Sequence, residues 1–425
     1  MNESDLLELS RPDPFQDQDK IHAIFTELRQ NNPVAWCPIA PDVAENGRGY
    51  WSVTKYDDIV TVSKNPEVFS SNVSDEGRGG IVMMDPLEYE QRGESLETNN
   101  SQFSNRGKSM ITMDPPQHNQ HRKMVAPGFT PQKLSDMENG VRARVTEILD
   151  KLEGQEEFEF VSAVAAELPI QVLAELFNVP QEDRYKLFEW SNIIIGGDDP
   201  DIRVSQDHVM KSYMDMAMYA MSLRTNREQE EPGRDLISML AHSHYDGETM
   251  SVENYLSAFV LLVVAGNETT RNSISGGLLA LSKFPEQRER LLADRSLIPN
   301  AVDEIIRWVA PVAYMRRTAL VDTELHGQPI KQGDKLVMWY MSANRDEEKF
   351  DRPFEFDVTR TGPRHLSFGF GQHLCIGWRL AEIQLRILLE EMLERYPTMT
   401  ATGEIERLRS NFLNSIKRMP VKLAA

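Results

Sequence analysis

The stretch Phe368-Gly369-Phe370-Gly371-Gln372-His373-Leu374-Cys375-Ile376-Gly377 places three glycines and one cysteine within ten residues. The glycines predict a tight turn with an accessible backbone, because glycine reaches positive φ without steric cost. An amphipathic run from Trp378 to Arg395 follows, so Cys375 comes just before a predicted helix. Free amide N–H groups and the positive end of the helix dipole stabilise a thiolate at such a point. The stretch therefore predicts a cysteine thiolate held by backbone donors.

A thiolate in this position has two explanations. In mostly apolar surroundings it is a soft axial ligand for haem iron, which pushes electron density onto the metal and favours cleavage of the O–O bond. The alternative is a buried structural cysteine beside a glycine-rich turn, the usual meaning of an isolated Cys-x-Gly. The full pattern Phe-x-x-Gly-x-His-x-Cys-x-Gly is much rarer. It favours the ligand over the structural cysteine.

A second unusual stretch, Ala265-Gly266-Asn267-Glu268-Thr269-Thr270, lies in the middle of a long, otherwise apolar helix predicted over residues 251–283. A glycine inside a helix costs about 1 kcal/mol relative to alanine. Threonine can bond back to the carbonyl four residues earlier and open the helix locally. These features predict a groove beside Gly266 that admits a diatomic ligand, with Glu268 placed to pass protons. The alternative is close helix packing at Gly266, with Glu268 in a salt bridge.

Together the two stretches resemble the haem-ligand and oxygen-activation motifs of the cytochrome P-450 monooxygenases. The resemblance implies the fold of that family and haem b (iron protoporphyrin IX) as cofactor, with Cys375 as the proximal metal ligand. It also implies that Thr269 hydrogen-bonds dioxygen and that Glu268 is the acid of a proton relay beside Gly266. The cofactor contacts that it implies are Cys375, Phe368, His373, His118, Arg122 and Arg317.

Two groups of charged residues carry this resemblance further. His118 and Arg122 are one turn apart on a predicted helix and could donate together to a carboxylate; the alternative is two surface residues. By resemblance both bind haem propionates, and Arg317, rather than its neighbour Arg316, binds the other propionate. Glu304 and Arg307 have a favourable ion-pair spacing on one helix face. By resemblance they form a structural pair completed by Arg360, although a solvated surface pair is the usual meaning of Glu-x-x-Arg.

Composition limits the class of protein. The formal net charge of −20 argues against nucleic acid and anionic membrane surfaces as partners. The two cysteines, Cys37 and Cys375, suggest no disulfide framework, which fits the cytoplasm. No Cys-x-x-Cys-His occurs, so haem would be bound non-covalently. The N-terminus has no signal pattern, and the longest apolar run, from Phe259 to Ala265, falls far short of the roughly 20 residues of a membrane span. We expect no membrane anchor.

Helical periodicity dominates the chain, and we predict a mainly α protein with small β-sheets, folded as a single large domain over residues 1–425. Ser251 is a suitable N-cap for the long helix, and Phe284-Pro285 ends it. The segment from about 70 to 109 is rich in Ser, Asn, Glu and Gly and is predicted to be a substrate-lid loop, with a disordered insertion as the alternative. The other predicted helices span 17–30, 55–63, 134–152, 161–177, 181–195, 204–227, 235–243, 285–294 and 299–308, and strands are expected at 50–54, 323–325, 335–340 and within 407–423.

The resemblance also places walls around a substrate pocket, and nearly all of them are apolar. An apolar wall implies a guest that is apolar over most of its surface. Methionines at helical spacing in the helix predicted over 204–227 are either core residues or an adaptable lid. The pocket residues that the resemblance implies are Val263, Ala265, Val312, Ala313, Met315 and Phe412, and the methionines are Met210, Met214, Met218 and Met221.

The stretches 311–319, 333–340 and 380–388 resemble soluble bacterial alkane and fatty-acid terminal hydroxylases, whereas Ala265-Gly266-Asn267-Glu268 is more similar to hydroxylases of steroid side chains and branched lipids. Terminal hydroxylation of an alkyl chain is therefore the leading hypothesis. A cyclic terpenoid or steroid-ring hydroxylase is the alternative. A haem-thiolate redox or gas sensor, or a peroxide-driven peroxygenase, would not need the pair Glu268-Thr269.

The resemblance further implies that two electrons come from a separate ferredoxin and its NAD(P)H-dependent reductase, since no flavin or iron–sulfur motif is present. We expect the ferredoxin to dock on the Cys375 side, where Arg122, Lys123 and Arg379 offer local positive charge. O₂ and an apolar small molecule are the other expected partners.

Overall fold

Amphipathic helices form most of the chain in the computed structural model, which describes residues 3–44, 46–91, 109–196, 199–202, 205–245 and 248–423. The predicted helices are present, with ends shifted by a few residues. The helix predicted over 161–177 consists of a π-helical turn over Val161–Ala165 followed by α8, and α7 starts earlier than predicted, at Pro131, because the Thr130 side chain accepts a hydrogen bond from the Lys133 amide. The helices are α1 (Glu3–Glu8), α2 (Gln18–Asn31), α3 (Tyr56–Lys64), α4 (Pro86–Gln91), α6 (Gln117–Val125), α7 (Pro131–Asp150), α8 (Glu167–Phe177), α9 (Arg184–Ile195), α10 (Gln206–Glu228), α11 (Leu236–Ala241), α12 (Val252–Lys283), α13 (Pro285–Ala293), α14 (Ile298–Val309), α15 (Tyr340–Ala343) and α16 (Trp378–Arg395).

The strands are short and form small sheets, as predicted. The largest has five strands in the order β1-β2-β10-β7-β3, in which β10 pairs in parallel with β2 and antiparallel with β7. All five residues of β10 are buried, which is typical of a central strand. The strands are β1 (Val34–Cys37), β2 (Tyr50–Val53), β3 (Phe69–Ser70), β4 (Glu157–Glu159), β5 (His244–Tyr245), β6 (Glu248–Thr249), β7 (Tyr314–Ala319), β8 (Thr323–Leu325), β9 (Gln328–Ile330), β10 (Lys335–Trp339), β11 (Thr400–Ala401), β12 (Glu406–Arg407), β13 (Ile416–Arg418) and β14 (Pro420–Lys422).

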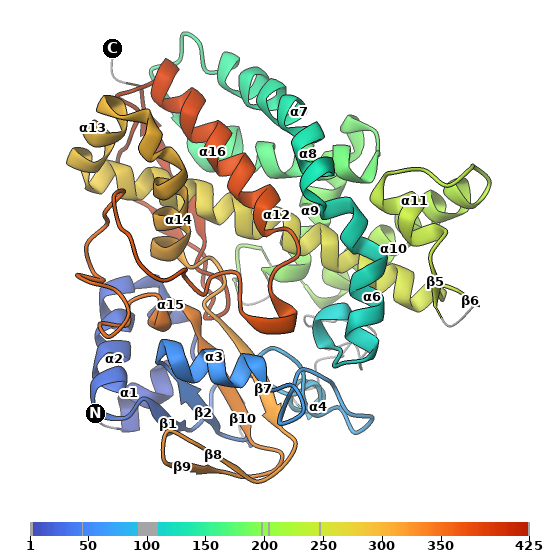
Figure 1. The fold of residues 1–425 in the computed structure, drawn as a ribbon, viewed down its shortest axis with the longest axis vertical. Helices are drawn as coiled ribbons and strands as arrows, with labels where there is room; N and C mark the ends of the chain where they lie inside the picture. Colours follow the sequence, from blue (N-terminus) through green and yellow to red (C-terminus); the bar gives the residue numbers. More distant parts are fainter. Residues whose placement is uncertain are drawn as a thin grey trace.

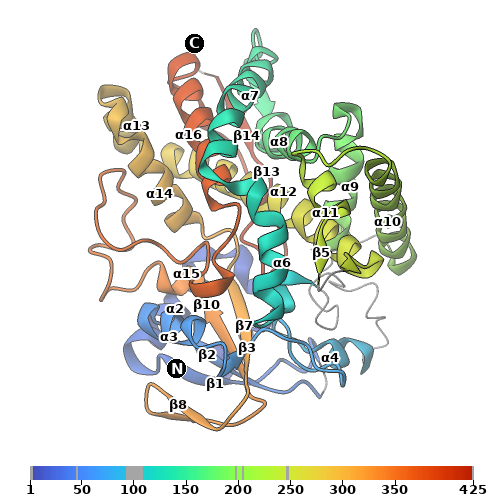
Figure 2. The same cartoon turned by 45° about the vertical axis from the view of Figure 1, so that its right-hand side comes forward.

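Helix α12 crosses the middle of the molecule (Figure 1). The five-stranded sheet and α1 to α3 lie on one side of it, and α7, α8 and α16 lie on the other; the turned view in Figure 2 shows the same division. The Ser251 side chain accepts from the Asn254 amide and so caps the helix as predicted. Two glycines allow α14 to pack closely on the second half of α12, since a Cβ atom at Gly276 would lie 2.5 Å from Val309 and one at Gly277 2.9 Å from Ile305.

A buried ion-pair network joins α14 to the segment that leads into the cysteine stretch. The Arg307 Nε atom lies 2.7 Å from the Glu304 carboxylate, and the Arg360 Nε atom lies 3.0 Å from the same carboxylate. Arg307 also donates to the carbonyls of Asn344 and Pro353. The three side chains expected to form a structural group are therefore in contact, and they hold the irregular chain after α15 against α14.

The first part of the predicted lid loop is anchored to the sheet. Arg316 on β7 pairs with Asp85 at 2.7 Å, and Lys335 on β10 lies 3.5 Å from the same carboxylate and also contacts Glu88. Residues 92–108, which make up most of the rest of the loop, lie outside the described residues, so the lid remains a prediction.

The methionine stripe on α10 differs from both explanations considered for it. Met214 and Met218 are 51% and 62% exposed, and Met221 packs only partly against the core. The stripe thus lies on an outer surface of α10 for much of its length. Helical spacing shows that the methionines share one face, but it does not show what that face contacts.

Candidate active site

The cysteine stretch forms a tight turn in front of α16, as predicted. The Cys375 amide donates to the Phe368 carbonyl at 2.9 Å, and Gly369 and Gly371 have φ values of 73° and 70°. A side chain at Gly371 would also collide with the Ser63 carbonyl of α3, which a Cβ atom would approach to 2.5 Å. Glycine is therefore required at this position both for the backbone angle and for space.

Cys375 lies deep in the protein, and its exposed surface faces an internal cavity. Burial raises the pKa of its thiol, while the amides of Gly377 and Trp378 and the positive charge of Arg122 oppose that rise. Burial and these donors therefore act on the pKa of the thiol in opposite directions. A cation bound to the sulfur would further stabilise the thiolate.

Four basic side chains gather at one end of the same cavity. Arg122 on α6 donates to the Leu374 carbonyl at 2.7 Å, and the rings of His118 and His373 lie 4.2 Å apart. Arg317 on β7 donates to the Arg316 carbonyl at 2.7 Å and also lines the cavity. Burial lowers the pKa values of His118, His373 and Arg317.

The two arginines of this cluster have no acidic partner among the described residues. Among the described residues, no carboxylate forms an ion pair with Arg122 or Arg317, and Asp114 nearby accepts hydrogen bonds from Ser70 and from the Ser71 amide. Arg316 points to the other side of β7 and pairs with Asp85, since successive strand residues face opposite ways. Arg317 is therefore the arginine that the strand presents to the cavity.

This donor set fits the haem group that the sequence predicts. A buried guanidinium without an acidic partner is costly, and two carboxylates entering the cavity would neutralise the cluster. The thiol of Cys375 opens onto the cavity as a soft ligand, and Phe368 lines it as well. Cys375 would hold the iron, and His118, Arg122, Arg317 and His373 would hold the propionates.

Helix α12 contributes one wall of the cavity. Its lining residues recur at helical spacing, and Gly266 and Thr269 are among them. The Thr269 hydroxyl donates to the Ala265 carbonyl at 2.9 Å, which is the back-bond expected from the sequence. A Cβ atom at Gly266 would have a single neighbour, Leu173 Cδ1, at 3.4 Å. Gly266 therefore faces open space, and close helix packing does not explain it.

Glu268 lies on a different face of α12. Its side chain is 1% exposed and pairs with Arg271. Burial raises the pKa of this carboxyl, and the Arg271 charge partly offsets the rise. Of the two alternatives for Glu268, the salt bridge is observed, and the carboxyl points away from the cavity that Thr269 lines. A polar chain continues behind the helix, because Ser415 receives a 3.4 Å hydrogen bond from Arg271 and donates to the Asn272 side chain at 2.6 Å.

Three of the six predicted pocket residues line the cavity: Ala265, Val312 and Met315. The other three do not, and these predictions are wrong. Val263 is fully buried on another side of α12, two residues from Ala265 and so about 200° around the helix. The Ala313 amide donates to the Phe412 carbonyl at 2.9 Å, and the Phe412 ring packs on Tyr314 in the core.

Most of the apolar wall comes from residues that no sequence motif marks. Leu173, Leu176 and Phe177 of α8 face α12 across the cavity, and Leu262, Ile81 and Met110 complete the enclosure. Periodicity within α12 could have indicated Leu262, which is three residues before Ala265. The α8 residues could not be found in this way, because their approach to α12 is a tertiary contact.

Comparison with known proteins gives the family. The model of the family described as Cytochrome P450 matches residues 166–423. A linalool 8-monooxygenase of Pseudomonas putida is 37% identical over 416 residues, which are 98% of this chain and 98% of that protein. A methyl-branched lipid omega-hydroxylase of Mycobacterium bovis is 39% identical over 411 residues, which are 95% of this chain and 91% of that protein. The solved structure of cytochrome P450-153 from Novosphingobium aromaticivorans has a TM-score of 0.84 at 41% identity and covers 99% of this chain and 100% of its own.

The chain belongs to the cytochrome P450 family. It is a monooxygenase of the haem-thiolate type, and the predicted family, fold class and enzyme class are confirmed. None of the helices within the described ranges combines the length and the apolar composition that crossing a bilayer requires.

Proposed function

We propose that this monooxygenase hydroxylates the end of an alkyl chain in an apolar small molecule, such as an alkane, a fatty acid or a steroid side chain. The observation that carries the proposal is the apolar wall opposite α12, where Leu173, Leu176 and Phe177 offer a guest no polar anchor. A chain is held there by shape and by burial of its surface. The name of one relative described above, a methyl-branched lipid omega-hydroxylase, supports a chain end as the site of reaction.

Haem b, when bound, supplies the activation of O₂ through its thiolate-ligated iron. The protein residues contribute binding and proton handling. Thr269 presents its hydroxyl at the cavity surface, next to the open space beside Gly266, and its back-bond to Ala265 fixes the side chain. It can exchange that bond for one to a ligand, and so hold a proton at Oγ1.

Glu268 supplies the proton from behind the helix in this proposal. Burial raises the pKa of this carboxyl, and a turn away from Arg271 brings the acid toward the cavity. Thr269 and Glu268 are adjacent in sequence, so one local movement of α12 suffices to connect them.

Substitution of Thr269 tests the proton-handling role. Thr269→Ala should keep NADH consumption going while product per NADH falls by about tenfold or more, because the proton is no longer delivered in step with O₂ reduction. Thr269→Ser keeps the hydroxyl and should restore most of the coupling. Equal coupling in wild type and the alanine variant would show that Thr269 has no such role.

The substrate class is tested by product analysis. The haem-loaded protein, supplied with a surrogate ferredoxin and reductase, should convert linear and methyl-branched chains to terminal alcohols detected by mass spectrometry. Selective oxidation of ring carbons in a cyclic terpenoid or steroid, with no terminal alcohol from any chain, would favour the alternative substrate class. No turnover of any compound, despite normal reduction of the haem, would favour a sensor.

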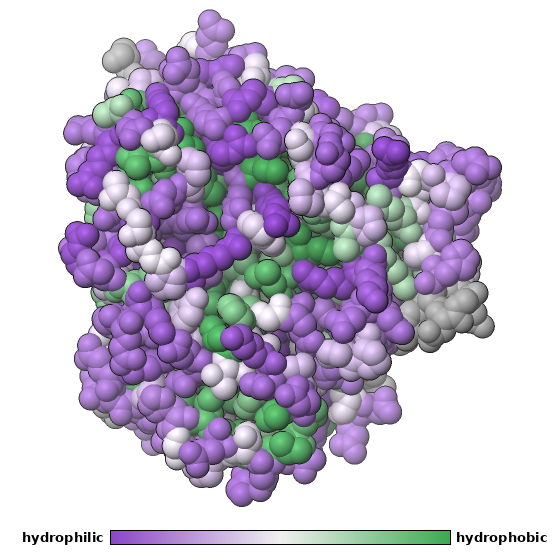
Figure 3. All heavy atoms as spheres, in the orientation of Figure 1, coloured by the Kyte–Doolittle hydropathy of each residue, from purple (hydrophilic) through white to green (hydrophobic). Residues whose placement is uncertain are grey.

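We further infer that a ferredoxin docks near the cysteine turn. Lys123 and Arg379 are exposed on that side, whereas Arg122 is directed into the cavity and is not part of this surface. Figure 3 shows hydrophilic residues over most of the face that carries α6 and α16, with apolar residues in its middle. Both cysteines are free, which supports a reducing compartment such as the cytoplasm.

A further inference from the structure

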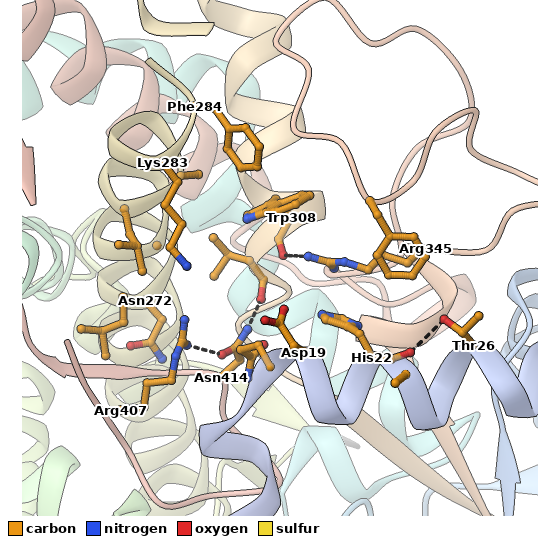
Figure 4. A pocket seen from close by; sticks show the side chains of 18 of the residues that line it. Asp19, His22, Thr26, Asn272, Lys283, Phe284, Trp308, Arg345, Arg407 and Asn414 are labelled. Carbon is orange, nitrogen blue, oxygen red and sulfur yellow. Dashed lines mark hydrogen bonds between the residues drawn. The ribbon is translucent and has the colours of Figure 1, made fainter. Parts of the chain in front are cut away.

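A second cavity lies further along α12 than the haem cavity, beside the C-terminal half of the helix. It has a volume of ≈ 630 Å³, in the range of small-molecule sites. The second half of α12 forms one wall and α2 the opposite wall, and the end of α14 and the strands β12 and β13 close it (Figure 4). None of the residues that line this cavity lines the haem cavity.

Three side chains that line this cavity each carry a buried polar atom with no hydrogen-bond partner among the described residues. They are Nη1 of Arg345, Nδ2 of Asn272 and Nδ1 of His22, from side chains that are 4%, 1% and 9% exposed. Each such atom costs free energy when it is buried unpaired. The three side chains come from α2, from α12 and from the segment after α15, so the tertiary fold assembles the polar part of the cavity wall.

The charges around the cavity favour an anion. Within the described part of the chain, Arg345, Arg407 and Lys283 form no ion pair with a carboxylate, although Arg345 stacks on Trp308 at 4.6 Å and Arg407 donates to the Asn414 side chain at 3.1 Å. Figure 4 shows that Lys283 and Arg407 reach into the space from one side and Arg345 and His22 from the other.

The behaviour of His22 supports a positive local potential. Burial lowers the pKa of its imidazole, and the charged neighbours that lower it further are all arginines: Arg345, Arg29, Arg407 and Arg307. Arg29 and Arg307 are paired with Glu347 and Glu304, so Arg345 and Arg407 are the unneutralised members of that group. Asp19 and Glu27 of α2 also line the cavity, and Figure 4 shows Asp19 between the two groups of basic side chains, where its carboxylate offsets part of their positive charge.

We propose that this cavity is a binding site for a small organic carboxylate with an apolar body. The carboxylate accepts hydrogen bonds from Arg345, Arg407 and Asn272, in the way that guanidinium and amide groups bind carboxylates elsewhere. The body packs against the rings and aliphatic side chains that form the rest of the wall, among them Trp308, Phe284, Phe354, Leu279 and Ile416. The site is independent of the proposed substrate, because it does not share residues with the haem cavity.

The test uses the full-length, haem-loaded protein and 4-phenylbutyrate as the probe, with calorimetry for binding and the Soret band to report on the haem cavity. Arg407→Gln should weaken binding by about tenfold, the usual result of losing one charge-assisted hydrogen bond. Arg418→Gln is the matched control, because that arginine is 70% exposed on β13 and does not line the cavity. Ala23→Trp, at the exposed mouth on α2, should abolish binding without removing any charge.

The neutral analogue 4-phenylbutanamide should bind at least about tenfold more weakly, because it carries no negative charge. Equal affinity of the acid and the amide, or unchanged affinity in both Ala23→Trp and Arg407→Gln, would overturn the proposal. A Soret shift that tracks the binding of the probe in every variant would also overturn it, since the probe would then occupy the haem cavity. Ala23→Trp keeps the test valid if Arg407→Gln fails to fold.

Discussion

Gly266 and Gly276 of α12 should respond in opposite ways to the same added methyl group. Alanine in place of glycine inside a helix stabilises it by about 1 kcal/mol before any tertiary contact is considered. At Gly266 the methyl meets a single atom, Leu173 Cδ1, at 3.4 Å, an ordinary contact. Gly266→Ala should therefore keep most of this gain.

At Gly276 the same methyl would lie 2.5 Å and 3.0 Å from the two Cγ atoms of Val309. Carbon atoms prefer separations of about 3.5–4.0 Å, and overpacking of a core costs about 1–3 kcal/mol. The overlap offsets the helix gain or exceeds it. Gly276→Ala should thus be less stable than Gly266→Ala by about 2 kcal/mol, which is the overpacking cost alone, because the helix gain is common to both variants.

Urea unfolding of both variants, followed by circular dichroism, measures this difference, and carbon monoxide binding to the reduced protein measures its functional side. Gly266→Ala should bind carbon monoxide several-fold more slowly, because its methyl enters the haem cavity, whereas Gly276→Ala should bind it at the wild-type rate. A Gly266→Ala protein that is as unstable as Gly276→Ala, with normal carbon monoxide binding, would refute the assignment of Gly266 to the cavity.

Three further outcomes are expected. Glu304→Gln removes the acidic partner of Arg307, which is 2% exposed, and should lower the free energy of unfolding by about 3–5 kcal/mol in urea titrations. The control is Glu406→Gln, in an exposed pair at 3.7 Å from Arg418, which should change the free energy of unfolding by less than about 1 kcal/mol. Burial lowers the pKa of His365 to about 3, and its Nδ1 accepts from the Ser367 amide. The folded protein then binds fewer protons than the unfolded chain below pH 6.5, so its stability falls as the pH falls. At pH 5 this histidine should lower the free energy of unfolding by about 2 kcal/mol. His365→Asn, which keeps a hydrogen-bond acceptor, should reduce this dependence on pH. Leu173→Ala should change the dissociation constant of an apolar guest, measured from the spin-state shift that the guest causes. Val263→Ala should lower the free energy of unfolding by about 1 kcal/mol and leave the guest's affinity unchanged. Altered guest binding in both variants would contradict this assignment.

The fold could be predicted where a local pattern exists. The helical periodicity of residues 134–152 and 251–283 gave helices that the structure contains as α7 and α12. Helix α1 was missed because it has only six residues and none of them is buried, so no apolar stripe marks it. The pairing of Leu336 with Trp51 in the five-stranded sheet joins segments that are distant in sequence, and no local signal encodes it.

The residues of the candidate site could likewise be predicted only where a contiguous motif contains them. Cys375, Gly266 and Thr269 lie in contiguous motifs, and the structure brings them to one cavity. The pocket predictions at Ala313 and Phe412 were wrong because nearness to a motif in sequence does not determine which way a side chain points. In the loop before β7 the backbone of Ala313 pairs with that of Phe412, and this pairing directs both side chains into the core.

The buried pair Glu268–Arg271 is better explained by chemistry than by stability. Taking two charges out of water costs several kcal/mol for each ion, and apolar residues of similar size often stabilise a core equally well or better. Glu268 is 1% exposed, and Arg271 also bonds Asn192 at 2.8 Å and Ser415 at 3.4 Å. A carboxyl held in this way, one residue from a cavity-facing threonine, has a raised pKa and a partner that it can leave. The proton delivery proposed for Glu268 would account for the presence of an acid on α12 behind the wall of the haem cavity.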